Sequence, residues 1–147
     1  MRIAVIAVLC CLAEIVAPAV VAAEPSGTVD ATPPSLAYVT VAGAPGDGEQ
    51  ALAAALSRQL AARGLKPADA FQANVYEVQG TVRMAPAGKG KQSVTIIWVV
   101  LAPDGTQLGI TRQSKNVRKG SLDKSWGAAA QAAAAAAAAD IVKLIPR

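Results

Sequence analysis

The amino-acid sequence predicts an α+β fold, a two-layer sandwich with a four-stranded mixed sheet and two helices on one face. Alternating residue types predict strands at residues 36–41 and 74–84. Residues 93–102 are apolar on both faces from Ile96 onward, which predicts a central strand, and the more polar residues 107–114 predict an edge strand. Two segments with apolar residues at helical spacing follow the first and the last of these strands. The order is therefore β-α-β-β-β-α, with a parallel first pair joined by a right-handed crossover and then an antiparallel meander.

The first part of the 147-residue chain has the pattern of an export signal. Residues 1–23 begin with Arg2, continue with an apolar run and end with small residues, as secretory signal peptides do. Glu14 interrupts the run, and the segment is long enough to span a bilayer, so a retained amino-terminal anchor is the alternative to cleavage. Residues 24–35 are rich in Pro and small residues and predict a flexible tether. Residues 36–147 form the single α+β domain.

The amino-acid composition argues against most kinds of catalytic chemistry. The chain has no histidine, and both cysteines, Cys10 and Cys11, lie in the signal-like segment. Thiol, zinc and iron–sulfur chemistry are therefore unexpected in the mature domain, and the usual general base is missing. We expect no cofactor, no metal and no enzymatic activity. Leu9 precedes Cys10 where a bacterial lipoprotein signal needs a small residue, which argues against lipidation.

A glycine-rich loop connects the first strand to the first helix and poses the question of a nucleotide site. The spacing of Gly43 and Gly48 is that of a phosphate-binding loop, but Glu49 follows where such a loop has lysine. A looser dinucleotide pattern would use Asp69 about twenty residues further on. We favour a structural turn, in which Asp47 caps the helix in a capping box with Gln50, over the nucleotide or anion site.

The later elements show mainly structural features. Gly80 falls on the buried side of the second strand, where we expect its missing side chain to let a helix approach. Residues 85–92 are expected to form a hairpin loop, and residues 93–102 a central strand. The alanine-rich segment after Ser121, which Ser121 or Asp123 would cap, predicts a helix anchored by Trp126.

Two groups of residues are candidate contacts. A basic cluster near the second helix can meet lipid phosphates, lipopolysaccharide or an acidic protein face, or can be a solvated loop; its members are Arg112, Lys115, Arg118, Lys119 and Lys124. Nucleic acid is not expected, because no aromatic residues are interleaved with these cations. On the strand face opposite Trp98, an apolar strip suggests a partner protein, a second copy or the tether folding back; it consists of Ile97, Val99 and Leu101.

The segments "YVTVAGAPGDGEQALAAALSRQLAARGL" and "ANVYEVQGTV" resemble a group of small bacterial envelope proteins. The group includes the amino-terminal domain of the Tol-system β-propeller protein, the curli-secretion lipoprotein and the activators of penicillin-binding proteins. The tail "GSLDKSWGAAAQAAAAAAAADIVKLI" is similar to envelope lipoproteins of proteobacteria. The resemblance implies a non-catalytic adaptor or assembly factor.

The sequence therefore predicts an exported, periplasmic protein of the cell envelope, with membrane association if the amino-terminal segment is retained. Its expected partner is another envelope protein or a second copy of itself. The alternative is a binder of an anionic glycolipid or small ligand through residues 112–124.

Overall fold

The computed structural model describes residues 35–146, which belong to one compact unit. The predictions for the signal peptide and for the tether up to residue 34 lie outside these residues. The observed elements are β1 (Leu36–Ala42), α1 (Gly48–Ala61), β2 (Lys66–Pro67), β3 (Tyr76–Gly88), β4 (Lys91–Leu101), β5 (Gln107–Arg118) and α2 (Gly127–Leu144). Within the described residues no helix combines the length and the apolarity needed to cross a membrane.

The sheet has five strands in the order β2-β1-β3-β4-β5, so the expectation of a four-stranded sheet is wrong. The additional strand is β2, which pairs in parallel with the first two residues of β1. It has two residues, one of them Pro67, and therefore shows no alternation; proline is tolerated there because the strand lies at an edge. The α+β sandwich is otherwise similar to the expected one, with β1 parallel to β3 and an antiparallel β3-β4-β5 meander.

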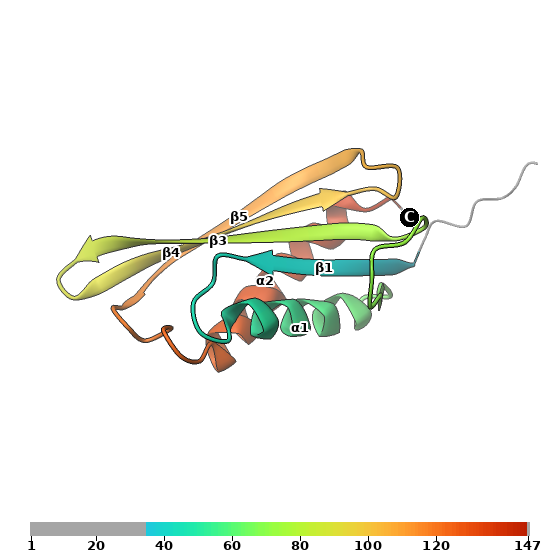
Figure 1. Ribbon diagram of the computed structural model, residues 1–147. Helices are drawn as coiled ribbons and strands as arrows, with labels where there is room; N and C mark the ends of the chain where they lie inside the picture. Colours follow the sequence, from blue (N-terminus) through green and yellow to red (C-terminus); the bar gives the residue numbers. More distant parts are fainter. Residues whose placement is uncertain (1–34, 147) are drawn as a thin grey trace, which may run out of the picture. The chain divides into compact units, whose positions relative to one another are not determined.

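Both helices pack on the same face of the sheet, and the core lies between the two layers (Figure 1). Trp98, on β4, is fully buried on this face. Its indole lies over Gly80 of β3, where an added Cβ would come 2.5 Å from the ring atom Cζ3. The missing side chain at Gly80 thus makes room for the neighbouring tryptophan and not, as expected, for a helix.

The β3–β4 hairpin is longer than the sequence indicated. Only Lys89 and Gly90 separate the two strands, so the expected loop at residues 85–92 is strand on both sides of a two-residue turn. Lys89 and Gly90 have positive φ angles of 50° and 68°, as the tightest hairpin turn requires at both central residues. The hairpin projects past the ends of both helices (Figure 1).

The glycine-rich loop is a docking point for the start of α2. Asp47 does not cap α1 with its side chain; its Oδ1 accepts a hydrogen bond from the backbone N–H of Trp126 at 2.8 Å. The Trp126 indole N–H donates to the carbonyl oxygen of Pro45 at 3.0 Å. Accordingly α2 begins at Gly127, after Trp126, and neither Ser121 nor Asp123 caps it.

The protein itself occupies three of the backbone donors of this loop. The Gly43 N–H donates to a carboxylate oxygen of Glu49 at 2.9 Å. The N–H groups of Asp47 and Gly48 donate to the carbonyl oxygens of Lys124 and Pro45. A bound phosphate would have to displace these partners, so the loop's geometry is that of a structural turn.

Candidate binding surface on the open sheet face

The sheet face opposite the helices carries two different halves. Its residues are fixed by the strand register, because cross-strand partners point to the same side. On β4 the open-face positions are Lys91, Ser93 and Thr95 near the hairpin, then the apolar strip of Ile97, Val99 and Leu101. The open face therefore changes from basic and hydroxylated to apolar along a single strand.

The half near the hairpin is basic. Three exposed cations lie on it, and a fourth, Arg112, lies at its border with the apolar strip, opposite Ile97. We call the four the open-face cations: Arg83, Lys91, Arg112 and Arg118. Lys91 and Arg118 are directly opposite each other in the β4–β5 register. Like charges in that position repel and lower stability. Residues 78–103 and 105–122 contain no Asp or Glu to compensate them.

None of the open-face cations is neutralised by an ion pair in the described part of the chain. The single ion pair among residues 35–146 joins Lys143 to Asp140 on α2, at 3.1 Å. Between the open-face cations lies a small hydroxyl cluster, in which Ser114 contacts Thr95 at 3.2 Å and Ser93 at 3.4 Å between oxygens. The surface thus offers positive charge and hydrogen-bonding hydroxyls together.

The other half of the face is apolar. The strip of Ile97, Val99 and Leu101 is half-buried, and Ile110 extends it as the cross-strand partner of Val99. Ile110 is 54% exposed, one of two large hydrophobic residues exposed to that degree among residues 35–146. Glu77 and Gln79 of β3 border the strip and are hydrogen-bonded to each other at 2.9 Å.

The predicted basic cluster does not form one surface. Arg112 and Arg118 lie on the open face, whereas Lys115 points to the helix side, as the partner of the buried Val94. Lys119 and Lys124 lie in the loop before α2. The alternation of residues 74–84 already put Arg83 on the side of the apolar strip, but sequence reasoning did not group it with these cations, and it missed Lys91. Combining the alternation of each strand with the hairpin pairing would have grouped both with Arg112 and Arg118.

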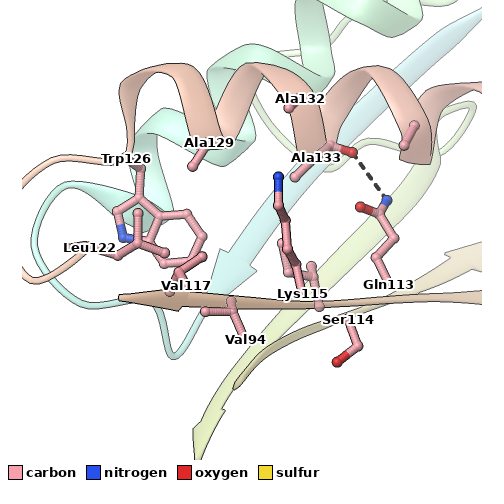
Figure 2. A pocket seen from close by; sticks show the side chains of 12 residues that line it. Val94, Gln113, Ser114, Lys115, Val117, Leu122, Trp126, Ala129, Ala132 and Ala133 are labelled. Atoms are coloured by element: carbon pink, nitrogen blue, oxygen red, sulfur yellow. Dashed lines mark hydrogen bonds between the residues drawn. The ribbon is translucent and has the colours of Figure 1, made fainter. Parts of the chain in front are cut away.

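On the helix side, a groove separates β5 from the first half of α2 (Figure 2). Its volume is about 400 Å³, and its walls are mostly apolar. Leu122 and Trp126 close one end, and the α2 side chains that line the groove are all methyl groups, those of Ala129, Ala132, Ala133 and Ala136. Lys115 is the one charged residue that lines the groove.

Carboxylates are sparse in the domain. Residues 35–146 contain no group of three or more His, Cys, Asp or Glu side chains arranged to hold a metal ion. The backbone N–H of Thr106 donates to Asp104 at 2.8 Å and lowers the pKa of that exposed carboxyl in the β4–β5 turn. The hydrogen bond stabilises the turn and lies apart from both surfaces described above.

No protein-family model and no curated protein matches the chain. Among solved structures it is similar to a PelC dodecamer from Paraburkholderia phytofirmans, with 16% identity and a TM-score of 0.47 over 76% of this chain and 88% of that one. A minor lipoprotein from Acinetobacter baumannii is 12% identical, with a TM-score of 0.42 over 76% of this chain and 90% of that one. A protein described as uncharacterized is 14% identical, with a TM-score of 0.47 over 74% and 89%. No residue role is carried over from them.

Proposed function

We propose that the protein is a non-catalytic component of the bacterial cell envelope that binds another envelope protein through the open face of its sheet. The observation that carries this proposal is the set of four open-face cations, which share one sheet face with an apolar strip and have no acidic partners among the described residues. Protein interfaces combine an apolar centre with a polar rim, and arginine is enriched in them. The partner accordingly presents an apolar surface bordered by acidic side chains.

Two further features support this role. The register pair Lys91 and Arg118 repels in the free protein, and an anionic partner would relieve the repulsion. The resemblance of residues 38–65 and 73–82 to proteins of the Tol, curli-secretion and penicillin-binding-protein-activator groups favours an adaptor or assembly role in the periplasm. Binding of a partner requires no histidine or cysteine chemistry, and residues 24–147 contain neither residue type.

Site-specific photocrosslinking in living cells tests the proposal. A crosslinkable residue at Asn116 or Val99, both on the open face, is expected to capture a reproducible protein partner. The same residue at Ala139, exposed on α2, is the matched control and should capture none. Replacing Arg83 and Arg112 with glutamine should weaken capture, because a rim charge mainly accelerates association. Equal capture from both faces, or none from either, would contradict the proposal.

A second candidate is an anionic lipid surface, favoured by the tip of the β3–β4 hairpin. Lys89 and Lys119 join Lys91 and Arg118 there, and the Lys119 N–H donates to the Gly90 carbonyl at 2.9 Å. Cations gathered on a projecting element can meet the phosphates of a membrane or of lipopolysaccharide. Binding to vesicles with anionic lipid that disappears between about 50 and 300 mM salt, without any protein crosslink, would favour this candidate.

A further inference from the structure

The groove between β5 and α2 exists because α2 is built from alanine where it passes β5. Four alanines line the groove from the helix, while Val94, Ile96 and Val117 line it from the sheet. A methyl group fills little of the space between two layers, so a hollow of about 400 Å³ remains. Pockets for small ligands in proteins start at about 300 Å³ and have mostly apolar walls.

Lys115 gives the groove its polarity. Figure 2 shows its side chain rising from β5 toward α2, with the ammonium group beside the helix. The residue is exposed overall, so its charged end remains in contact with water while its stem lies along the apolar wall. No acidic residue lines the groove. An occupant with an apolar body and a negative end would match both features.

A polypeptide fits this groove poorly. A peptide strand or helix end would bring backbone N–H and C=O groups into apolar surroundings, where unpaired polar groups are costly. The Gln113 amide already donates to the carbonyl oxygen of Ala133 at 3.1 Å. The Ser114 side chain points away from the groove, toward the open face, in Figure 2. An alkyl chain has no polar groups that need partners.

We propose that this groove binds a free fatty acid, with the alkyl chain between β5 and α2 and the carboxylate paired with Lys115. The site is on the opposite side of β5 from the open-face cations, so it is independent of the protein-binding surface proposed above. The juxtaposition of an alanine-walled apolar groove and a single cation carries the assignment.

Tryptophan fluorescence can measure the binding directly, with dodecanoate as the probe and the full chain prepared without detergent. Trp126 lines the groove, whereas the chain's other tryptophan, Trp98, is not among the lining residues. Titration with dodecanoate should change the fluorescence emission of Trp126, and the change should level off once the groove is saturated. Each methylene removed from the probe should weaken binding about fourfold until the head group dominates. Dodecan-1-ol and dodecyltrimethylammonium, which lack the negative charge, should bind on the order of tenfold more weakly.

Two kinds of variant locate the site. Lys115→Gln removes the charge and leaves a polar side chain that is one atom shorter. It should weaken dodecanoate binding on the order of tenfold, with little effect on dodecan-1-ol. Lys66→Gln, on the other edge of the sheet, is its control and should change neither. Ala132→Leu and Ala136→Leu fill the groove and should abolish binding; Ala128→Leu and Ala139→Leu place the same side chain on exposed positions outside the lining.

Several results would overturn the proposal. Equal affinity for the carboxylate, the alcohol and the ammonium probe would show that Lys115 recognises no head group. Full binding by Ala136→Leu, with unfolding curves that show a native fold, would place the ligand elsewhere. Dimerisation in sedimentation that Ala136→Leu abolishes, without any dodecanoate binding, would assign the groove to a second copy. None of these results bears on crosslinking at Asn116, so the two proposals fail separately.

Discussion

The two sides of α2 are made of the same residue and are packed in opposite ways. On one side, Ala130, Ala134, Ala137 and Ala138 are buried in the core, and the adjoining Trp126 leaves no room for a methyl group on Gly48 of α1. On the side toward β5, alanines line a groove of about 400 Å³. A small side chain thus permits either close approach or empty space, and the facing element decides which one results.

An alanine-to-leucine substitution should lower the free energy of unfolding much more on the core side of α2 than on the groove side. Ala134→Leu adds three carbons to a fully buried position and should lower the free energy of unfolding by about 3 kcal/mol, because the packed core has to move. Ala136→Leu, at the groove, should change it by less than about 0.5 kcal/mol. Urea unfolding curves of both variants measure the difference. A large loss for Ala136→Leu would show that the groove is as tightly packed as the other side.

The first residues of the two helices provide a second paired comparison. A Cβ on Gly48 would lie 2.5 Å from the Trp126 Nε1 atom, so Gly48→Ala must displace the indole from its hydrogen bond with Pro45. We expect a loss of about 2 kcal/mol in stability. The nearest atom to a Cβ on Gly127 is 3.8 Å away, so Gly127→Ala should be neutral or stabilising by up to about 1 kcal/mol. Thermal unfolding of both variants would show equal shifts if the indole can relax without cost.

The hydrogen bond between Asp47 and the Trp126 N–H links the starts of the two helices, and its contribution to stability can be measured. Asp47→Ala removes the acceptor of the Trp126 backbone N–H, and we expect a loss of about 1 kcal/mol in urea unfolding. Asp140→Ala is the control, because its exposed pair with Lys143 on the outer surface of α2 should contribute at most about 0.5 kcal/mol. Equal effects of the two variants would mean that the link between the helix starts adds no stability.

The smallest expected effect lies away from both sides of α2, at Asp104. The Thr106 N–H holds the pKa of this carboxyl below its ordinary value of 3.8 in the folded protein. A depressed pKa adds stability that is complete above the ordinary value and is lost as the pH falls through the folded-state pKa. The free energy of unfolding of Asp104→Asn should therefore fall less than that of the wild type as the pH is lowered from about 5 to 2. An unchanged pH profile would contradict this role.

The parts of the fold that are periodic were accessible from the sequence. Alternation placed Val78 and Val82 of β3 on the buried face, and helical spacing indicated both helices. The two-residue β2 was missed, because an edge pairing next to Pro67 leaves no pattern. Asp47 occupies the N-cap position of α1, but the predicted capping by its side chain is wrong. The actual partner of the side chain, Trp126, is 79 residues away, and no local motif signals it.

The candidate surface was predictable only where one strand carries it. The strip of Ile97, Val99 and Leu101 follows from the alternation of β4 alone. The basic cluster was defined by closeness in sequence. The strand register places its members on different faces, because successive strand residues point to opposite sides. Lys115 therefore lies on the other side of the strand from Arg112. The groove could not be foreseen, since it depends on the distance between β5 and α2.

The hydrogen bond from Trp126 to Asp47 also constrains the order in which the chain folds. The β3-β4-β5 meander joins strands that are neighbours in sequence, whereas this contact closes a loop of 79 residues. Closing a long loop costs more conformational entropy than closing a short one, which delays the contact. We expect the meander to be formed in the folding transition state and α2 to dock after it. Mutations at Val94 or Val100 should then slow refolding, and Asp47→Ala should mainly accelerate unfolding, as kinetic φ-values would reveal.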